Sequence, residues 1–536
     1  MNSKTSEIVL ASKGSVSDII LQRQKALVTE KDPTLLSLAD SLRSTRLQLS
    51  NLYVSGSGGD TTGYYENQID SLSKAAAGIE SELSRKSASF HARQDQKDVS
   101  PKRIIASLSQ KETLLDYMRY EYWATKQPKV VPRYLVSVLT GQGKQVAVDL
   151  GEADGIDSLV TSYRKHLLSV ARQGFLPTAA DREAYQTVAK QLYDRAVKPV
   201  EKYLKDKNLV FIAPDGALDL VSFAALVDSK GSYLTERFPI QYLSSGRDLI
   251  RLKDKPAEGH GLFAVGDPDF DASIDARMKK TSEPLLAATV ASDAEYQTRN
   301  VRSGCGSLSD LKVESLPFTR NEVEAVGHLW QGKGMDSAEV LAGAQATEDA
   351  FKTQAPGKRV IHLATHGYYL TGQCAPQIAS RHSFGSDQGF VGENPLLQSG
   401  LLFAGSNLHG AGCDSAHCED GILSASEVSG LDLTGTDLVV LSACETGLGE
   451  VKEGEGVYGL RRAFQMAGAR TVVSSLWPVP DQATAEVMSQ LYSQSKKSLP
   501  ERLRDLQLAQ IKKLRASGAS DHPYSWAAFI ALGDWL

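Results

Sequence analysis

Over residues 1–100, apolar side chains recur every three or four positions, the spacing that places them on one face of an α-helix. Two such runs occur, separated by the Gly- and Ser-rich stretch 54–63, which favours a loop. The runs are formed by Leu35, Leu38, Leu42, Leu49 and Leu52, and by Ile69, Leu72, Ala76, Ile79, Leu83 and Phe90. The pattern predicts a helical-hairpin arm with a structural packing role, and a docking surface for a regulator is the alternative.

The spacing between apolar side chains changes further along the chain. Residues 129–151 alternate between apolar and polar side chains around Gly-Gln-Gly, which predicts a β-hairpin, and residues 156–206 return to helical spacing. Beyond them, short apolar runs alternate with helical segments, which is typical of a largely parallel sheet covered by helices on both faces. The sequence therefore predicts a helical arm in 1–100, a mixed β-hairpin and helical region in 101–206, and an α/β domain in 207–536.

Two of the apolar runs end in side chains that can do chemistry. RVIHLATHG (359–367) places His366 and Gly367 just past one predicted strand, and DLVVLSACETGLG (437–449) places Cys444 past another. Because ligands bind at the carboxyl ends of strands in open α/β sheets, neighbouring strands would bring the imidazole close to the thiol. This is the arrangement that a cysteine nucleophile needs, with His366 as base or proton shuttle. The backbone N–H groups of Gly367 and Cys444 are the candidates for an oxyanion hole.

Each of these residue types also has a structural explanation. A cysteine at a strand end is usually a small buried hydrophobe, and a histidine inside a strand is usually core, as we expect for His362. What favours catalysis for Cys444 and His366 is their joint occurrence at the ends of two predicted strands.

The second half of the chain resembles the CHAT family of caspase-like proteases, which are related to separases. The segments that carry the resemblance are IAPDGALDLVSFAAL (212–226), VGDPDF (265–270), LPFTRNEVEAV (316–326), IHLATHG (361–367), DGILSASEVSGLDL (420–433), LSACETGLG (441–449), GEGVYGLRRAFQMAGARTVVSSLWPVPDQAT (454–484) and HPYSWAAFIALGD (522–534). The resemblance implies a caspase-like α/β fold and a thiol protease without a cofactor. It also implies the nucleophile and base roles for Cys444 and His366.

The segment after the predicted strand 470–476 bears on substrate selectivity. Separases carry a similar Leu-Trp-Asp-Val-Thr-Asp segment whose second Asp lines the pocket for an arginine, and Asp481 aligns with that position. A carboxylate there would favour Arg or Lys at P1 through charge-assisted hydrogen bonds, with Trp477 and Ser475 as pocket walls. The first Asp is replaced by Pro478, and the alternative role of Asp481 is a helix N-cap.

An insertion between the two catalytic strands, residues 371–421, is rich in Gly, Ser and Asn. It contains Cys413, His417 and Cys418, whose spacing is not that of a recognised zinc site, because adjacent side chains rarely turn toward one ion. We therefore expect a mobile loop and no metal. Such a loop beside the site could be an activation switch, ordered by a partner or cut at Arg381.

The composition of the chain limits the classes of partner and the compartment that we expect. The chain has 536 residues, a net charge of −5 and no long basic tract, so neither nucleic acid nor an anionic membrane is the expected partner. No apolar run has membrane-spanning length, and the start of the sequence lacks the apolar core of a signal peptide, so we expect a cytoplasmic protein. Five cysteines in a chain of this length do not form a disulfide scaffold, and a reducing compartment suits a working thiol.

These observations predict a cysteine endopeptidase that cleaves proteins after Arg or Lys. The resemblance further implies activation by a regulatory protein or complex, and a role in bacterial defence or regulated cell death. Two alternatives remain at this point: a catalytically silent caspase-like scaffold, and an acyl-transfer thioesterase that uses the same two residues. Reaction of Cys444 with an electrophilic peptide separates enzyme from scaffold, and amide turnover separates protease from thioesterase.

Overall fold

The computed structural model describes most of the chain, namely residues 13, 33–55, 62–86, 100–123, 130–173, 177–253, 258–278, 312–332, 336–370, 395–408, 419–443, 446–447, 449–452, 456–493 and 496–535. One eleven-stranded sheet forms its centre. The strands are β1 (Glu112–Trp123), β2 (Val130–Thr140), β3 (Gln145–Glu152), β4 (Leu209–Ala213), β5 (Ile240–Tyr242), β6 (Leu262–Pro268), β7 (Ala338–Gly343), β8 (Val360–Ala364), β12 (Leu438–Leu441), β15 (Thr471–Ser475) and β16 (Phe529–Gly533). Their order across the sheet is β3-β2-β1-β4-β5-β16-β15-β12-β8-β6-β7.

The sheet has two halves that run in opposite directions. In one half β1, β4, β5 and β16 are parallel to one another, and in the other half β15, β12, β8, β6 and β7 are parallel. The halves meet where β15 pairs antiparallel with β16. The carboxyl ends of β8 and β12 precede His366 and Cys444. They therefore lie along the same side of the sheet, and the carboxyl ends of β1 and β4 lie along the opposite side.

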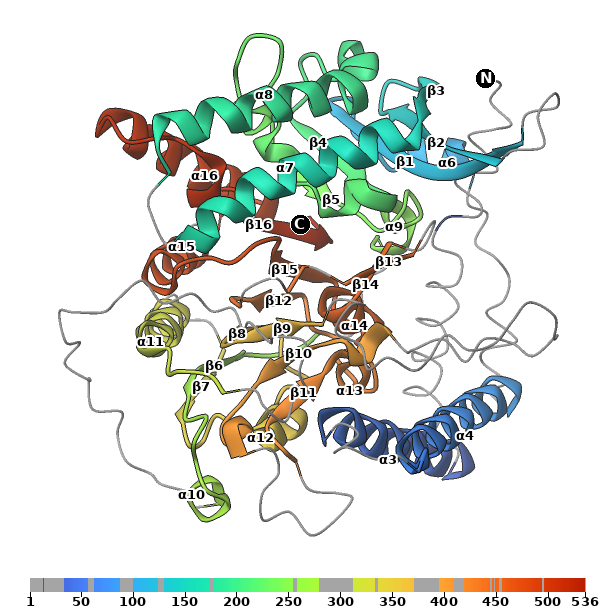
Figure 1. Ribbon diagram of the computed structural model, residues 1–536, viewed down its shortest axis with the longest axis vertical. Helices are drawn as coiled ribbons and strands as arrows, with labels where there is room; N and C mark the ends of the chain where they lie inside the picture. The colour runs from blue at the N-terminus through green and yellow to red at the C-terminus, as the bar shows by residue number, and fades with distance from the viewer. Residues whose placement is uncertain are drawn as a thin grey trace.

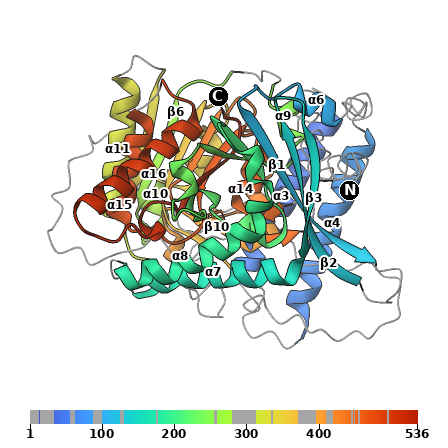
Figure 2. The ribbon, with the colours of Figure 1, turned by 90° about the horizontal axis from the view of Figure 1, so that it is seen from above.

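Helices cover both faces of this sheet, so β6, β8, β12 and β15 of the second half are almost entirely buried, whereas the edge strand β7 is half-buried. The longer helices are α7 (Ala153–Gln173), α8 (Ala179–Ala196), α11 (Pro317–Gln331), α15 (Asp481–Ser493) and α16 (Leu499–Ala516), and they share one continuous core with the sheet. The shorter helices α6 (Pro101–Ile105), α9 (Asp248–Arg251), α12 (Glu348–Gln354), α13 (Ala425–Val428) and α14 (Leu460–Ala467) pack in separate clusters. Figures 1 and 2 show α7 and α8 on one side of the molecule and α6 and α9 on the opposite side.

Smaller elements complete the fold around the site. The strands β9 (Gly367–Tyr369), β10 (Ser399–Leu402) and β11 (Ile422–Ser424) form a three-stranded sheet that begins directly after His366. The strands β13 (Glu450–Lys452) and β14 (Gly456–Tyr458) form a two-stranded sheet just after the position of Cys444. Helix α10 (Ile274–Met278) and the 3-10 helix η2 (Gly216–Leu220) follow β6 and β4 respectively.

The helical hairpin expected near the N-terminus is present as α3 (Pro33–Ser55) and α4 (Tyr64–Lys86). The start of α3 packs on the end of α4 through Leu42 and Leu83, and the end of α3 packs on the start of α4 through Leu49 and Tyr65, so the two helices are antiparallel. Helix α3 contacts α13, which places the arm against the α/β region in Figure 1. Phe90, which we expected in the same apolar stripe, lies outside the described residues.

The β-hairpin expected in 129–151 is formed by β2 and β3, and it does not stand apart from the main sheet. Strand β1 pairs antiparallel with β2 on one side and parallel with β4 on the other. The eleven-stranded sheet therefore crosses the boundary that we predicted between 101–206 and 207–536. The fold as a whole is α/β, with a largely parallel sheet between helical layers, as the alternating pattern predicted.

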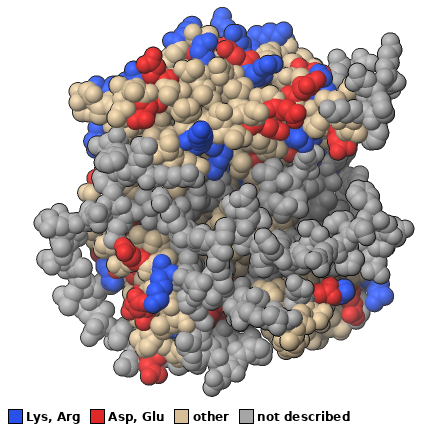
Figure 3. All heavy atoms as spheres, in the orientation of Figure 1, with Lys and Arg blue, Asp and Glu red and all other residues tan. Residues whose placement is uncertain are grey.

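The face of the molecule seen in Figure 3 is mixed in charge. Basic and acidic side chains are interspersed over the described part of this face. None of the helices in the described ranges combines the length and the apolar character needed to span a bilayer.

Candidate active site

The strands that carry the two candidate catalytic residues are direct neighbours. Strands β8 and β12 pair in parallel, with Leu363 opposite Leu441. His366 is the third residue after Leu363, and Cys444 is the third residue after Leu441. Cys444 itself lies outside the described residues, as does Glu445, but the chain is described up to Ala443.

His366 is buried, with 5% of its surface exposed, and its ring is held from two sides. Its Nε2 lies 2.9 Å from the backbone carbonyl oxygen of Glu314, in the segment that leads into α11. The ring of Phe270 packs against it with the centroids 5.3 Å apart. Because a carbonyl oxygen can only accept, Nε2 carries the proton in this contact, and Nδ1 is the nitrogen that can take up another.

The orienting role of Glu314 was missed by sequence analysis. It is carried by a main-chain oxygen, which every residue has, so no side-chain motif marks it. The sequence offers only an indirect signal for this contact. The segment LPFTRNEVEAV (316–326) indicates a helix, and Glu314 lies just before it.

The end of β12 is fastened to β15 just before the nucleophile position. The Ser475 hydroxyl donates a 2.7 Å hydrogen bond to the carbonyl oxygen of Ala443, and the Thr446 hydroxyl lies 3.3 Å from the same oxygen. On the far side of the turn, the Gly447 N–H donates to the Ser475 carbonyl at 2.8 Å. A Cβ on Gly447 would lie 2.8 Å from that carbonyl oxygen, so this approach requires glycine.

Ser475 and Trp477, which the sequence suggested as pocket walls, both lie inside the fold. Their exposed fractions are 0% and 1%. The Trp477 indole Nε1 donates to the carbonyl oxygen of Tyr524 at 3.2 Å. In this arrangement Trp477 ties the turn after β15 to the segment before β16, while Ser475 positions the residue before Cys444.

Asp481, the predicted P1 carboxylate, is also buried and already has a backbone partner. It is the first residue of α15, and its Oδ2 accepts the N–H of Phe318 in the first turn of α11 at 3.2 Å. A carboxylate at a helix N-terminus is stabilised by the unpaired N–H groups and the helix dipole. Asp481 therefore links the start of α11 to the start of α15. It belongs to α15, and its carboxylate caps the N-terminus of α11.

A second carboxylate, Asp267, acts electrostatically on the same region. Asp267 lies near the carboxyl end of β6 with φ of 45°, and its Oδ2 is 3.0 Å from Nε of Arg320. Burial raises the pKa of Asp267, Arg320 lowers it, and the charge of Asp481 raises it further. Two carboxylates and one guanidinium thus lie where α11 meets the sheet.

His362 is a core residue, as expected from its place inside the strand. It is fully buried, with Nε2 2.8 Å from Glu322 Oε1 and Nδ1 3.1 Å from the Tyr492 hydroxyl. Glu322 comes from α11 and Tyr492 from α15, so His362 joins both helices to β8. Its part is to position β8, the strand that ends before His366.

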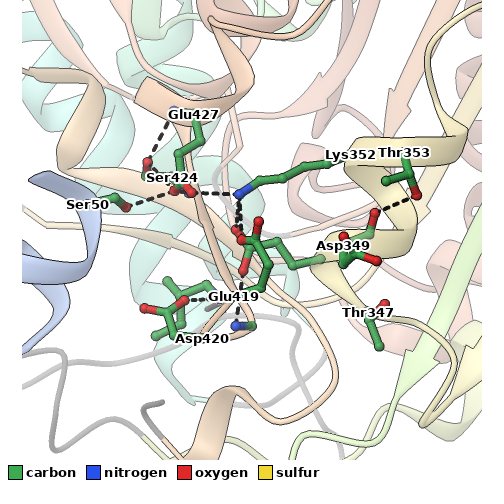
Figure 4. A network of polar contacts seen from close by, with 12 residues as sticks. Ser50, Thr347, Asp349, Lys352, Thr353, Glu419, Asp420, Ser424 and Glu427 are labelled. Carbon is green, nitrogen blue, oxygen red and sulfur yellow. Dashed lines mark hydrogen bonds and ion pairs between the residues drawn. The ribbon is translucent and has the colours of Figure 1, made fainter. Parts of the chain in front are cut away.

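The described residues also contain one carboxylate cluster that resembles a metal site in composition, formed by Glu348, Glu419 and Glu427. The ammonium group of Lys352 contacts all three carboxylates, at 2.8, 2.6 and 2.8 Å, so the cation of this cluster is a lysine side chain. Figure 4 shows Lys352 pointing into the group, with Ser50 of α3 reaching Glu427. This network fixes the helical arm to the α/β region. The candidate zinc ligands Cys413, His417 and Cys418 lie outside the described residues.

Comparison with known proteins assigns the chain to a family. The CHAT domain family matches residues 186–534, well over half of the chain. The chain belongs to the CHAT domain family. The match begins before residue 207, inside α8, and ends one residue after β16.

Curated relatives of this CHAT protein include tetratricopeptide repeat protein 28 of Homo sapiens, 24% identical over 353 residues, and that of Mus musculus, 27% identical over 358 residues. Each alignment covers 64% of this chain but only 13% of the relative's length. Among solved structures, two of the Saccharomyces cerevisiae separase–securin complex align over 88% of this chain and 34% of that one, with 8% identity and TM-scores of 0.42 and 0.43.

Proposed function

We propose that this CHAT protein is a cysteine endopeptidase in which Cys444 is the nucleophile and His366 the general base. The observation that carries the proposal is the placement of His366. Its strand is the direct neighbour of the strand that leads to Cys444, and its Nε2 is engaged by the Glu314 carbonyl, so Nδ1 is the basic nitrogen. Family membership supports the same pair of roles.

In the proposed reaction His366 Nδ1 takes the thiol proton as the sulfur of Cys444 attacks the scissile carbonyl carbon. The carbonyl oxygen becomes an oxyanion, for which the N–H groups of Gly367 and Cys444 are the proposed donors. When the C–N bond breaks, the imidazolium gives its proton to the leaving amine, and a thioester remains. Water, deprotonated by His366, then attacks the thioester and releases the acid and the free thiol.

We further propose that the substrate carries Arg or Lys at P1. Asp481 and Asp267 provide negative charge in the region where α11 meets the sheet, and Phe270, three residues after Asp267, packs on His366. A guanidinium or ammonium group can pair with such carboxylates through charge-assisted hydrogen bonds. Arg320 already neutralises part of the charge of Asp267, which makes Asp481 the stronger candidate.

Activation by a protein partner belongs to the same proposal. The curated relatives are named as tetratricopeptide repeat proteins, and this chain spans a small part of their length. In these relatives the segment that aligns with this chain is one part of a much longer protein, which supports control by other protein segments or partners. A role in bacterial defence or regulated cell death is supported by the family resemblance alone.

Covalent labelling tests the nucleophile directly. A peptidyl chloromethyl ketone with Arg at P1 should alkylate Cys444 in preference to the other four cysteines, and mass mapping after digestion identifies the modified residue. His366→Ala should slow the labelling, and the same peptide with Glu at P1 is the matched control. Labelling spread evenly over the cysteines, or unaffected by His366→Ala, would contradict the proposed pair.

A further inference from the structure

A buried lysine, Lys13, occupies a cage of oxygen atoms at the opposite edge of the sheet from His366. Its Nζ lies 2.8 Å from Asp116 Oδ1 and 2.7 Å from the carbonyl oxygen of Tyr117, both in β1. It also lies 2.9 Å from each of the carbonyl oxygens of Ala213 and Pro214, at the end of β4. The side chains of Lys13 and Asp116 both have 0% exposure.

The shape of the cage follows from the ends of the two strands. Strand β4 ends at Ala213, opposite Asp116, while β1 runs on, so the two chains diverge at this point and Lys13 Nζ accepts no bond but donates to carbonyl groups on both sides. The second carboxylate oxygen of Asp116 accepts the N–H of Gly246 at 2.9 Å, which fixes the direction of the first. Four oxygen atoms thus converge on one point, three from strands β1 and β4 and one from Pro214, the residue directly after β4.

The chemistry of the cage matches a primary ammonium group. An ammonium has three N–H donors and no acceptor, and the cage offers four acceptors and one negative charge. A guanidinium is planar and forked, so it does not fit a convergent point of this kind. A buried charge is tolerated only when it is paired and hydrogen-bonded, and here both conditions are met.

We propose that this cage is a lysine-binding site whose ligand is Lys13 of the chain's own N-terminal segment. The partners are far from Lys13 in sequence, with separations of 103 and 104 residues to β1 and of 200 and 201 residues to the end of β4. The contact therefore joins Lys13 to the first half of the sheet, in addition to the α3–α13 contact on the second half.

The cage also borders the turn that supports the chain after Cys444. The segment Pro214–Asp215 leads from the cage into η2, and η2 packs against both β13 and β14. Asp219 of η2 lies 4.0 Å from the guanidinium of Arg461 in α14, and the charge of Lys13 lowers the pKa of Asp219 against the effect of burial. Occupancy of the cage therefore stabilises the surface on which the β13–β14 hairpin rests.

Chemical accessibility tests the site in the unmodified protein. With limiting acetic anhydride, mass spectrometry should find Lys13 acetylated at least tenfold more slowly than the exposed Lys102 and Lys111, because a fully buried amine is shielded from the reagent. Equal acetylation rates for the three lysines would overturn the assignment.

Chemical rescue tests the ligand class. Lys13→Ala should lower the melting temperature, and n-butylammonium chloride should restore part of the loss in a saturable way, whereas tetramethylammonium and sodium chloride at equal ionic strength should not. Lys102→Ala is the matched control and should show neither effect. A melting temperature unchanged by Lys13→Ala, or rescue that is equal for all three salts, would overturn the proposal.

Hydrogen exchange tests the link to the hairpin. Lys13→Ala should speed amide exchange in peptides that contain β13 and β14, and butylammonium should slow it again. Exchange that rises elsewhere and not in these strands would overturn the link. Amide exchange does not depend on peptidase activity, so its outcome is independent of the proposed catalytic function.

Discussion

The hydroxyl of Ser475 donates a 2.7 Å hydrogen bond to the backbone carbonyl oxygen of Ala443, the residue directly before Cys444. Ser475 is the last residue of β15, so the strand next to β12 sets where the chain turns toward the nucleophile position. The Ser475 side chain therefore fixes the backbone beside the candidate nucleophile.

Ser475→Ala should therefore reduce catalysis more than stability. Loss of one neutral hydrogen bond lowers the free energy of unfolding by about 1 kcal/mol, whereas a small displacement of a reacting group lowers kcat by ~10- to 100-fold. The matched control is Ser474→Ala, one residue earlier on the same buried strand. Peptide-hydrolysis kinetics and thermal unfolding of both variants check this, and equal kcat values for the two would contradict a positioning role.

The contact between His366 and Glu314 predicts which tautomer the ring adopts. Nitrogen-15 NMR of the folded protein should show the neutral His366 ring protonated at Nε2, because the Glu314 carbonyl accepts there. Glu314→Ala should leave this tautomer and kcat within about twofold of wild type, since the main-chain oxygen is retained. A Nδ1-protonated ring, or a large loss in Glu314→Ala, would show that the orienting contact is different.

The buried pair of His362 and Glu322 predicts a large stability effect that is not catalytic. Glu322→Ala removes one partner of a fully buried pair, which lowers the free energy of unfolding by ~3–5 kcal/mol. Asn321→Ala, at the exposed neighbouring position, should change it by less than about 0.5 kcal/mol. Denaturant unfolding measures the free energy of unfolding of both variants. A small decrease in Glu322→Ala would mean that the His362–Glu322 pair does not stabilise this part of the core.

Asp219 predicts a pH dependence of stability. Burial raises the pKa of Asp219 to about 7 from the ordinary value of 3.8, so the folded state holds the proton more tightly than the unfolded state. This contribution to stability is complete below about pH 4 and is lost as pH rises through 7, by up to about 4 kcal/mol. Asp219→Asn lacks the ionisation and should escape the loss.

Unfolding free energies at pH 5 and pH 8 therefore provide the comparison for this carboxyl group. The stability of Asp219→Asn relative to wild type should rise between these pH values. Asp154→Asn, at an exposed position in α7, should show no comparable rise. A relative stability of Asp219→Asn that falls or stays constant with pH would contradict the raised pKa.

Local patterns predicted the parts of the fold that depend on local physics. Continuous apolar runs such as Val360–Ala364 predict strands buried on both faces, and this run is the strand β8 with all five residues buried. The helical period of residues 33–86 predicted α3 and α4 for the same reason. These features follow from spacing alone, so one sequence was enough to find them.

What sequence analysis missed depends on contacts between distant residues. Alternation in 129–151 predicts a hairpin but does not say which sheet it joins, and β1 pairs with β4 across almost a hundred residues. The Glu314 carbonyl, the Ser475–Ala443 bond and the capping of α11 by Asp481 all involve main-chain atoms, which have no residue signature. No sequence pattern marks Lys13, and only its burial and its partners reveal the cage.

Hydrolysis of a P1-varied fluorogenic peptide library, by wild type and by Cys444→Ala, tests the central claim most directly. The account predicts cleavage after Arg and Lys by the wild type, reduced in Asp481→Asn and absent in Cys444→Ala. Cleavage after other residues would retain Cys444 as nucleophile and remove Asp481 from the P1 site. Turnover of thioesters without amides would indicate an acyl-transfer enzyme. Activity that persists in Cys444→Ala would contradict the account.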